Sequence, residues 1–169
     1  MRLLALDLST TETGYAIMEV EKDKHPKVIK SGVIKIPSSL NESALKIIHV
    51  VEEVVKMIVK EDIEDAVSED IYFKYGRVNA FLALARLQGA FIFAFYKRKL
   101  RPPEHVSASE ARAALGLAKR KDEAMKGFNK KYKTKYTNDN EIDAIITGFA
   151  YCKLRIKMYR SIQKGEKIT

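Results

Sequence analysis

The first twenty residues, MRLLALDLSTTETGYAIMEV (1–20), contain the pattern that decides the fold. The apolar run from Leu3 to Leu8 is of the kind that becomes a buried strand, and Gly14 to Val20 predict a second strand after a polar turn. Asp7 places a carboxylate at the end of the first run. Burying a carboxylate is costly unless a cation or hydrogen bonds compensate it, so Asp7 is the first candidate for a functional residue.

Outward from this start, the sequence alternates between strand and helix patterns. Residues 28–36 predict a third strand, so the first three strands should form an antiparallel meander. Helical spacing predicts a helix over residues 41–60, and residues 65–71 read as a fourth strand. Later elements are expected at residues 79–98, 105–107, 107–115, 122–132 and 141–158. We predict one α/β domain over residues 1–169, a mixed β-sheet of about five strands with helices on both faces and a basic C-terminal helical tail.

The composition is that of an ordinary globular protein, with 169 residues, 46% of them hydrophobic and 31% charged. The longest apolar stretch, Ala90 to Tyr96, is far shorter than the roughly 20 residues of a membrane-spanning helix. Asp7 also interrupts any signal-peptide core, so we expect a cytoplasmic protein with no membrane partner. The single cysteine, Cys152, is expected to be a buried thiol.

The segment from Asn79 to Arg98 is apolar on nearly every side of a helix. Such a helix must be covered by more than its own sheet. Two interpretations are open: a subunit interface, or a helix in the centre of the core.

The net charge of +9 is concentrated late in the chain, where Lys119 to Lys135 is rich in lysine with aromatic residues between. A basic face of this kind suits a phosphate backbone, although a solvated surface has the same composition. The candidate nucleic-acid contacts from this segment are Lys119, Arg120, Lys121, Lys130, Lys131 and Lys133.

Glu69 and Asp143 repeat the pattern of Asp7, since each is an acid in apolar surroundings. Oxygen ligands without Cys or His point to Mg²⁺ or Mn²⁺ rather than zinc. Asp139 and Asn140 would share the helical face of Asp143, whereas Glu141 would point away unless the first turn frays. The alternative is that Asp139 or Asn138 only caps this helix.

Three segments resemble, in this order, the signature blocks of the RuvC family of Holliday-junction resolvases, within the ribonuclease H-like superfamily. They are LLALDLSTTETGYAI (3–17), AVSEDIYFKYGRVNAFLALARLQGA (66–90) and NDNEIDAIITGFA (138–150). A fourth segment, PPEHVSASEARAALGLAKRKDEAM (102–125), is similar to the family's Pro-containing segment, glycine turn and catalytic-side lysine. Together these segments cover most of residues 1–152.

The resemblance implies that Asp7, Glu69 and Asp143 are metal ligands for two Mg²⁺ ions, with Mn²⁺ as a substitute. The family's fourth ligand corresponds to Asn140 here, which departs from the pattern. Asp139 is the first substitute and Glu141 the second.

Further residues match the family's contacts to DNA. Lys121 matches its lysine near the scissile phosphate, and Tyr72, with Phe73 as the alternative, matches an aromatic that touches unstacked bases. Lys74 and Arg77 follow in the same segment and join the candidate contacts.

The implied function is a structure-specific DNA endonuclease that resolves Holliday junctions, and other branched DNA such as three-way junctions, by metal-dependent hydrolysis. The resemblance also implies a homodimer that makes paired, symmetric nicks, with the helix from Asn79 to Arg98 as the seam. The lysine-rich chain and the altered fourth ligand look more like bacteriophage members, for which the location would be the host cytoplasm.

Two functions from other classes compete with this one. A branched-DNA-binding protein could keep the fold while its catalytic site has decayed at Asn140. The segment DLSTTETG (7–14) also resembles the first phosphate loop of actin-like and sugar-kinase ATP-binding domains. The chain contains no Gly-Gly pair and no second glycine-rich loop for that fold.

Overall fold

A five-stranded mixed sheet forms the centre of the computed structural model, which describes residues 1–21, 24–72, 76–99 and 101–163, with side chains described as far as Arg155. The strand order is β3-β2-β1-β4-β5. The strands are β1 (Arg2–Asp7), β2 (Glu12–Glu19), β3 (Lys27–Lys35), β4 (Asp65–Glu69) and β5 (Glu104–Val106). β1, β2 and β3 pair antiparallel, while β4 is parallel to β1 and to β5, which confirms the expected sheet.

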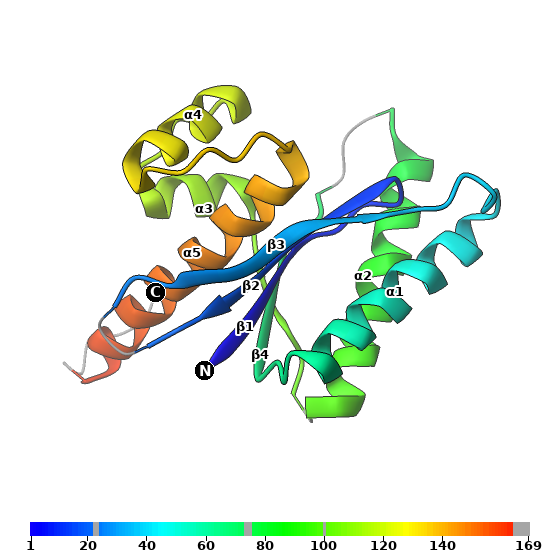
Figure 1. The fold of residues 1–169 in the computed structure, drawn as a ribbon, viewed down its shortest axis with the longest axis horizontal. Coiled ribbons are helices and arrows are strands. Elements are labelled where there is room, and N and C mark those ends of the chain that lie inside the picture. Colours follow the sequence, from blue (N-terminus) through cyan, green and yellow to red (C-terminus); the bar gives the residue numbers. More distant parts are fainter. Residues whose placement is uncertain (22–23, 73–75, 100, 164–169) are drawn as a thin grey trace.

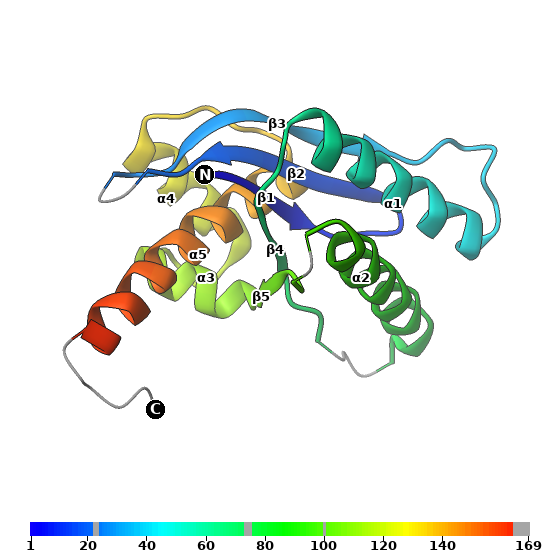
Figure 2. The ribbon, with the colours of Figure 1, turned by 90° about the horizontal axis from the view of Figure 1, so that it is seen from below.

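Helices cover both faces of this sheet (Figures 1 and 2). α1 (Ser43–Lys60) and α2 (Val78–Lys99) lie on one face, and α3 (Ala108–Leu115), α4 (Lys121–Tyr132) and α5 (Asp139–Gln163) lie on the other. α5 begins two residues earlier than the expected residue 141, because Asn138 caps its first turn. The basic character of the tail depends on side chains beyond Arg155, which lie outside those described.

The strand β1 is apolar on both sides because it faces two separate cores. Leu3 and Ala5 pack against α5, together with Val106 of β5 and Phe128 of α4. The alternate residues of β1 pack against α1 and α2, in a cluster with Val50, Val54, Ile58, Leu87 and Phe91. The period of two along the strand therefore directs one set of side chains to each layer of helices.

Helix α2 is only half covered by the sheet and α1. Its inner face buries Leu87, Phe91, Ala94 and Phe95. Large apolar side chains remain exposed on the other side, at Val78, Leu82, Phe93 and Tyr96. Within the described residues α2 is the one helix long and apolar enough to cross a membrane by length and composition alone, with 22% of its most apolar window buried. The helix is therefore not a central core helix of the single chain.

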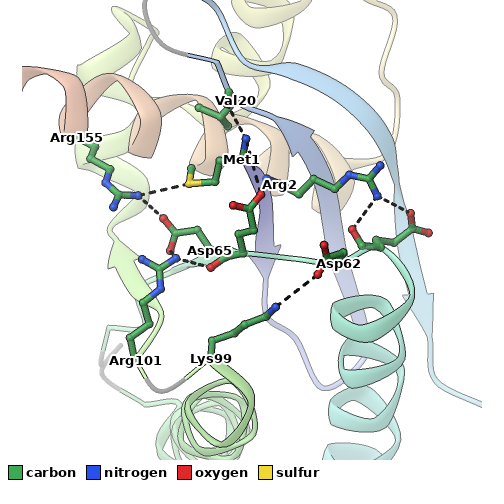
Figure 3. A network of polar contacts seen from close by, with 10 residues as sticks. Met1, Arg2, Val20, Asp62, Asp65, Lys99, Arg101 and Arg155 are labelled. Atoms are coloured by element: carbon green, nitrogen blue, oxygen red, sulfur yellow. Dashed lines mark hydrogen bonds and ion pairs between the residues drawn. The ribbon is translucent and has the colours of Figure 1, made fainter.

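Asp65 occupies the opposite end of β4 from Glu69 and is 2% exposed (Figure 3). Its carboxylate pairs with the guanidinium groups of Arg101, at 3.0 Å, and Arg155, and it accepts a hydrogen bond of 3.0 Å from the Tyr151 hydroxyl. Further ion pairs surround it, namely Met1 with Glu64, Arg2 with Glu61 and Lys99 with Asp62. Protein groups therefore compensate the charge of this buried acid.

The single cysteine, Cys152, follows Tyr151 in the chain and is buried, as expected from the sequence. Burial raises the pKa of its thiol to about 12.

Candidate active site

Asp7, Glu69 and Asp143 come together at one edge of the sheet. Asp7 ends β1 and Glu69 ends the neighbouring parallel strand β4, so both carboxylates lie at the carboxyl ends of adjacent strands and line one hollow. Asp143, 6% exposed, lies in the first turns of α5. The three acids are close enough for each of the other two to affect the ionisation of Asp7.

The electrostatics of this cluster are those of crowded carboxylates, of which Asp143 is buried and Asp7 and Glu69 are half-buried. Burial, followed by the charges of Glu69 and Asp143, raises the pKa of Asp7 to about 8. Burial and the charge of Asp143 raise the pKa of Glu69 to about 7. Lys121 and Arg112 oppose both shifts without cancelling them. When all three acids are ionised, the negative charge of the cluster therefore exceeds the positive charge of Lys121 and Arg112.

Two cations from the helices α3 and α4 approach Asp143. Lys121 Nζ lies 2.6 Å from Asp143 Oδ2 and 3.9 Å from Asp139 Oδ2. Arg112 Nη2 lies 3.8 Å from Asp143 Oδ1, and its Nη1 donates to the Lys119 carbonyl at 3.0 Å. Sequence reasoning had selected Lys121 but missed Arg112. Its one signal is that it is the only basic residue in an alanine-rich helix, ASEARAAL, whose Ala111 and Leu115 are buried.

The first turn of α5 separates the candidates for a fourth ligand. Asn138 Oδ1 accepts from the backbone N–H groups of Asn140 (2.9 Å) and Glu141 (3.0 Å), so this turn is capped and ordered. The Asn140 amide donates to the Glu12 carbonyl at 3.0 Å. The Glu141 carboxylate accepts from the Ser31 hydroxyl at 2.6 Å and so faces β3. Asp139 remains as the candidate that shares Lys121 with Asp143.

Gly14 explains how α5 comes so close to the sheet. Gly14 pairs with Asp7 across β1 and β2, and a Cβ atom added to it would lie 1.9 Å from the Asn140 carbonyl oxygen. Only glycine allows this approach, which brings the first turn of α5 beside Asp7. The adjoining loop is fixed by the buried Thr13, whose hydroxyl donates to the Ser9 carbonyl at 2.8 Å.

The donor set suits a hard divalent cation. Asp7, Glu69, Asp143 and Asp139 offer only carboxylate oxygens, the ligands that Mg²⁺ and Mn²⁺ prefer. As the described side chains stand, no three His, Cys, Asp or Glu residues enclose a cation. The Lys121 ammonium contacts Asp143 instead. The residues present fit the metal in charge and chemistry, because the uncompensated acids are the ones that a divalent cation would neutralise.

Two of the candidate DNA contacts, Tyr72 and Arg77, lie beside this cluster. A hollow of about 230 Å³ joins Asp7 and Glu69 to Tyr72, Arg77 and the start of α2. Tyr72 is 73% exposed, whereas Phe73 and Lys74 lie outside the described residues. The basic residues of the α4 region are exposed, but some have partners: Arg120 pairs with Asp122 and Glu123, and Lys131 donates to the Leu115 carbonyl. Lys119, Lys130 and Lys133 form no ion pair with other described residues.

Comparison with known proteins identifies the family. The family model described as crossover junction endodeoxyribonuclease RuvC matches residues 3–150. The chain belongs to the RuvC family. No curated protein matches it in sequence.

Solved structures of RuvC-family and other resolvases resemble this chain in fold. Thermus thermophilus RuvC in complex with Holliday junction substrate aligns with a TM-score of 0.77 at 14% identity, over 93% of this chain and 96% of that one. A second T. thermophilus RuvC structure aligns with a TM-score of 0.75 at 16% identity, over 93% of this chain and 97% of that one. The yeast mitochondrial Holliday junction resolvase aligns with a TM-score of 0.65 at 14% identity, over 97% of this chain and 83% of that one. These likenesses confirm the ribonuclease H-like fold.

Membership in the RuvC family also answers the choice between functions. The chain is a junction-resolving nuclease by family, and the ATP-binding alternative suggested by DLSTTETG is not supported. The matched residues 3–150 include the three acids, Lys121 and Arg112.

Proposed function

We propose that this RuvC-family chain cuts four-way DNA junctions by Mg²⁺- or Mn²⁺-dependent hydrolysis, with two ions held by Asp7, Glu69, Asp143 and Asp139. The observation that carries this proposal is the meeting of three acids at one sheet edge, where Lys121 and Arg112 offset only part of their negative charge. The T. thermophilus RuvC neighbour was solved in complex with a Holliday junction, which supports the same class of substrate here.

The side chains have distinct roles in the proposed reaction. When bound, divalent ions would lower the pKa of an attacking water and stabilise the leaving oxygen. The acids would hold these ions at the edge of the sheet. Lys121 would neutralise the charge that grows on the phosphate, with Arg112 as a second cation.

Branched DNA would reach the site along two surfaces. Tyr72 and Arg77 border the hollow beside Glu69, where an unstacked base at a branch point can contact an aromatic side chain. Lys119, Lys130 and Lys133, which pair with no acid among the described residues, would present their charge to the phosphates of a duplex arm. Neither surface requires four arms, so we propose that three-way junctions are also cut.

The chain is proposed to act as a homodimer through α2. The exposed apolar side chains Val78, Leu82, Phe93 and Tyr96 lie at nearly whole helical turns from one another and form one stripe. Pairing this stripe with its two-fold copy would cover it and provide two identical sites for paired nicks on opposed strands. We propose the cytoplasm as the place of action, the host cytoplasm if the chain is of phage type.

A cleavage assay with labelled four-way, three-way and linear duplex DNA tests the proposal. Wild type in Mg²⁺ should make paired, symmetric nicks that disappear in EDTA. Glu69→Gln should bind the junction with unchanged affinity and not cut it. Glu104→Gln, on the exposed part of β5, is the matched control and should cut normally. Tight binding without cleavage by wild type under Mg²⁺ and Mn²⁺ would instead indicate a non-catalytic branched-DNA-binding protein.

A further inference from the structure

A polar bridge that the proposed chemistry does not use lies directly behind Glu69. Ser68, the preceding residue of β4, is completely buried, and its Oγ lies 2.9 Å from Nδ1 of His105 on β5. Gln88 of α2 places Nε2 3.2 Å from the same ring nitrogen. One imidazole nitrogen therefore joins β4, β5 and α2.

The donors and acceptors of this bridge fit a neutral histidine. The Gln88 amide nitrogen can only donate, so Nδ1 of His105 accepts and the ring proton is on Nε2. Partial burial, which lowers the pKa of His105, favours the same neutral form. Ser68 then also donates a hydrogen bond to Nδ1, so the hydroxyl and the amide share the one lone pair of this nitrogen. Without His105 this buried hydroxyl would lose the hydrogen-bond partner that the structure gives it.

Glu69 depends on this part of the sheet for its position. Ser68 is the last residue of β4 that pairs with β1, opposite Leu6. Glu69 pairs only with Val106, on a strand of three residues. The support for Glu69 is therefore a short edge strand, and His105 is the residue that ties this strand to Ser68 and to α2.

We propose that His105 is a positioning residue that locks β4 and β5 to α2 and so holds the Glu69 carboxylate in place to bind metal. The inference rests on the proposed function, because it takes Glu69 as a metal ligand. It adds a link from the apolar helix α2 through Gln88 and His105 to the metal-binding strand. Groups that orient metal ligands from behind typically change metal affinity or activity by 10–100-fold when they are replaced.

Mn²⁺ binding measured by calorimetry, together with junction cleavage kinetics, tests His105. His105→Phe fills the space without an acceptor and should weaken Mn²⁺ binding about tenfold and lower kcat, with KM for the junction unchanged. His105→Asn, whose Oδ1 lies near the position of Nδ1, should restore most of both. The control His49→Phe replaces a histidine of α1 that bonds the Lys35 carbonyl and should change neither.

A second set of variants separates positioning from loss of folding. Ser68→Ala should reduce Mn²⁺ affinity, and Ser68→Ala combined with His105→Phe should be no weaker than His105→Phe alone, because both remove the same hydrogen bond. If His105→Phe fails to fold, Ser68→Ala and His105→Asn provide the comparison. Wild-type Mn²⁺ affinity in Ser68→Ala or in folded His105→Phe, or equal losses in His105→Asn and His105→Phe, would overturn the inference. Failure of wild type to cut any junction while it binds Mn²⁺ would contradict the proposed function instead.

Discussion

Asp7, which is half-buried, and Asp65, which is buried, lie on neighbouring strands and have different partners. Asp65 has two arginines and a tyrosine hydroxyl on its carboxylate. Asp7 has two further acids beside it, and burial together with their charges raises its pKa to about 8. The partners that the fold supplies therefore distinguish the ion-paired Asp65 from Asp7, the proposed metal ligand.

Asp7→Asn should stabilise the metal-free protein at high pH. The folded state holds a proton on Asp7 up to a pKa of about 8, whereas in the unfolded state this carboxyl group has its ordinary pKa of 3.8. Between these values the folded state binds more protons, so the free energy of unfolding of wild type falls as pH rises. Asparagine does not ionise, so the free energy of unfolding of the variant does not fall in this way as pH rises. In EDTA at pH 8 its Tm should exceed that of wild type by at least about 2–4 °C, the shift expected for roughly 1 kcal/mol.

The same thermal scans provide the control. The difference in Tm should shrink toward pH 4, and Mg²⁺ should raise the Tm of wild type more than that of Asp7→Asn. A difference that does not change with pH would show that Asp7 is not the titrating group.

Asp139→Asn should identify the fourth ligand. Asp139 shares the Lys121 ammonium with Asp143, whereas Glu141 bonds Ser31 on the far side of the turn. We expect Asp139→Asn to weaken Mn²⁺ binding and to slow cleavage about tenfold or more, and Glu141→Gln to change Mn²⁺ affinity by less than about twofold. Calorimetry and single-turnover cleavage measure the two effects. A larger loss in Glu141→Gln would reverse the assignment.

At the scale of the element, α2 has two faces with different tasks. Its inner face completes the core, with Leu87 and Phe95 fully buried. Its outer face leaves Phe93 65% exposed and Tyr96 47% exposed, an arrangement that a soluble helix without a partner rarely has. Gly89 lies on this outer side with open space around its Cβ position, so a second helix can approach there.

Phe93→Glu should convert a dimer into a monomer. A charge in the middle of the exposed stripe would have to be desolvated without a partner when two copies of α2 meet. Multi-angle light scattering should give a dimer mass for wild type and a monomer mass for the variant, with unchanged far-UV circular dichroism. Val59→Glu, at an equally exposed apolar residue of α1, serves as the control. A monomer mass for the wild type would contradict the proposed dimer interface through α2.

At the scale of the whole molecule, the two ends of the parallel strands divide stability from chemistry. The amino end of β4 carries the Asp65 network, which links β4 to α5 and to Arg101 before β5 (Figure 3). The carboxyl end carries Glu69 and the hollow beside it. The ion-paired acid and the proposed metal ligand of β4 therefore lie at opposite ends of the strand.

Asp65→Asn should destabilise the protein without affecting the metal site. Removal of the charge leaves Arg101 and Arg155 facing a nearly buried neutral group, and we expect a loss of about 2–3 kcal/mol in the free energy of unfolding, below the range for a fully buried pair because both arginines are partly exposed. Urea denaturation measures this loss. Asp62→Asn, whose side chain is 90% exposed, should lose less than about 0.5 kcal/mol. A change in Mn²⁺ affinity in Asp65→Asn would contradict the division between the two ends.

The order of strands and helices was predictable because apolar residues repeat with the period of a strand or of a helix within each element. Apolar runs flanked by turn residues placed β1 to β4 to within about two residues, and the expected helix over residues 107–115 matches α3 to within one residue. The buried-acid argument selected Asp7, Glu69 and Asp143 but gave no reason to treat Asp65 differently from them. Residue type alone does not reveal whether a cation lies across the fold.

The sequence by itself determined the α/β class, the family and the acids at the strand ends, because these depend on local pattern and on motifs that are contiguous in the chain. Only the tertiary structure decided which partners meet across the fold. It brought Arg112 to Asp143, tied Asn140 and Glu141 to β2 and β3, and joined Gln88 to Ser68 through His105. These contacts join residues far apart in the chain, and their geometry depends on how closely α5 packs on Gly14 and how α2 lies against the sheet.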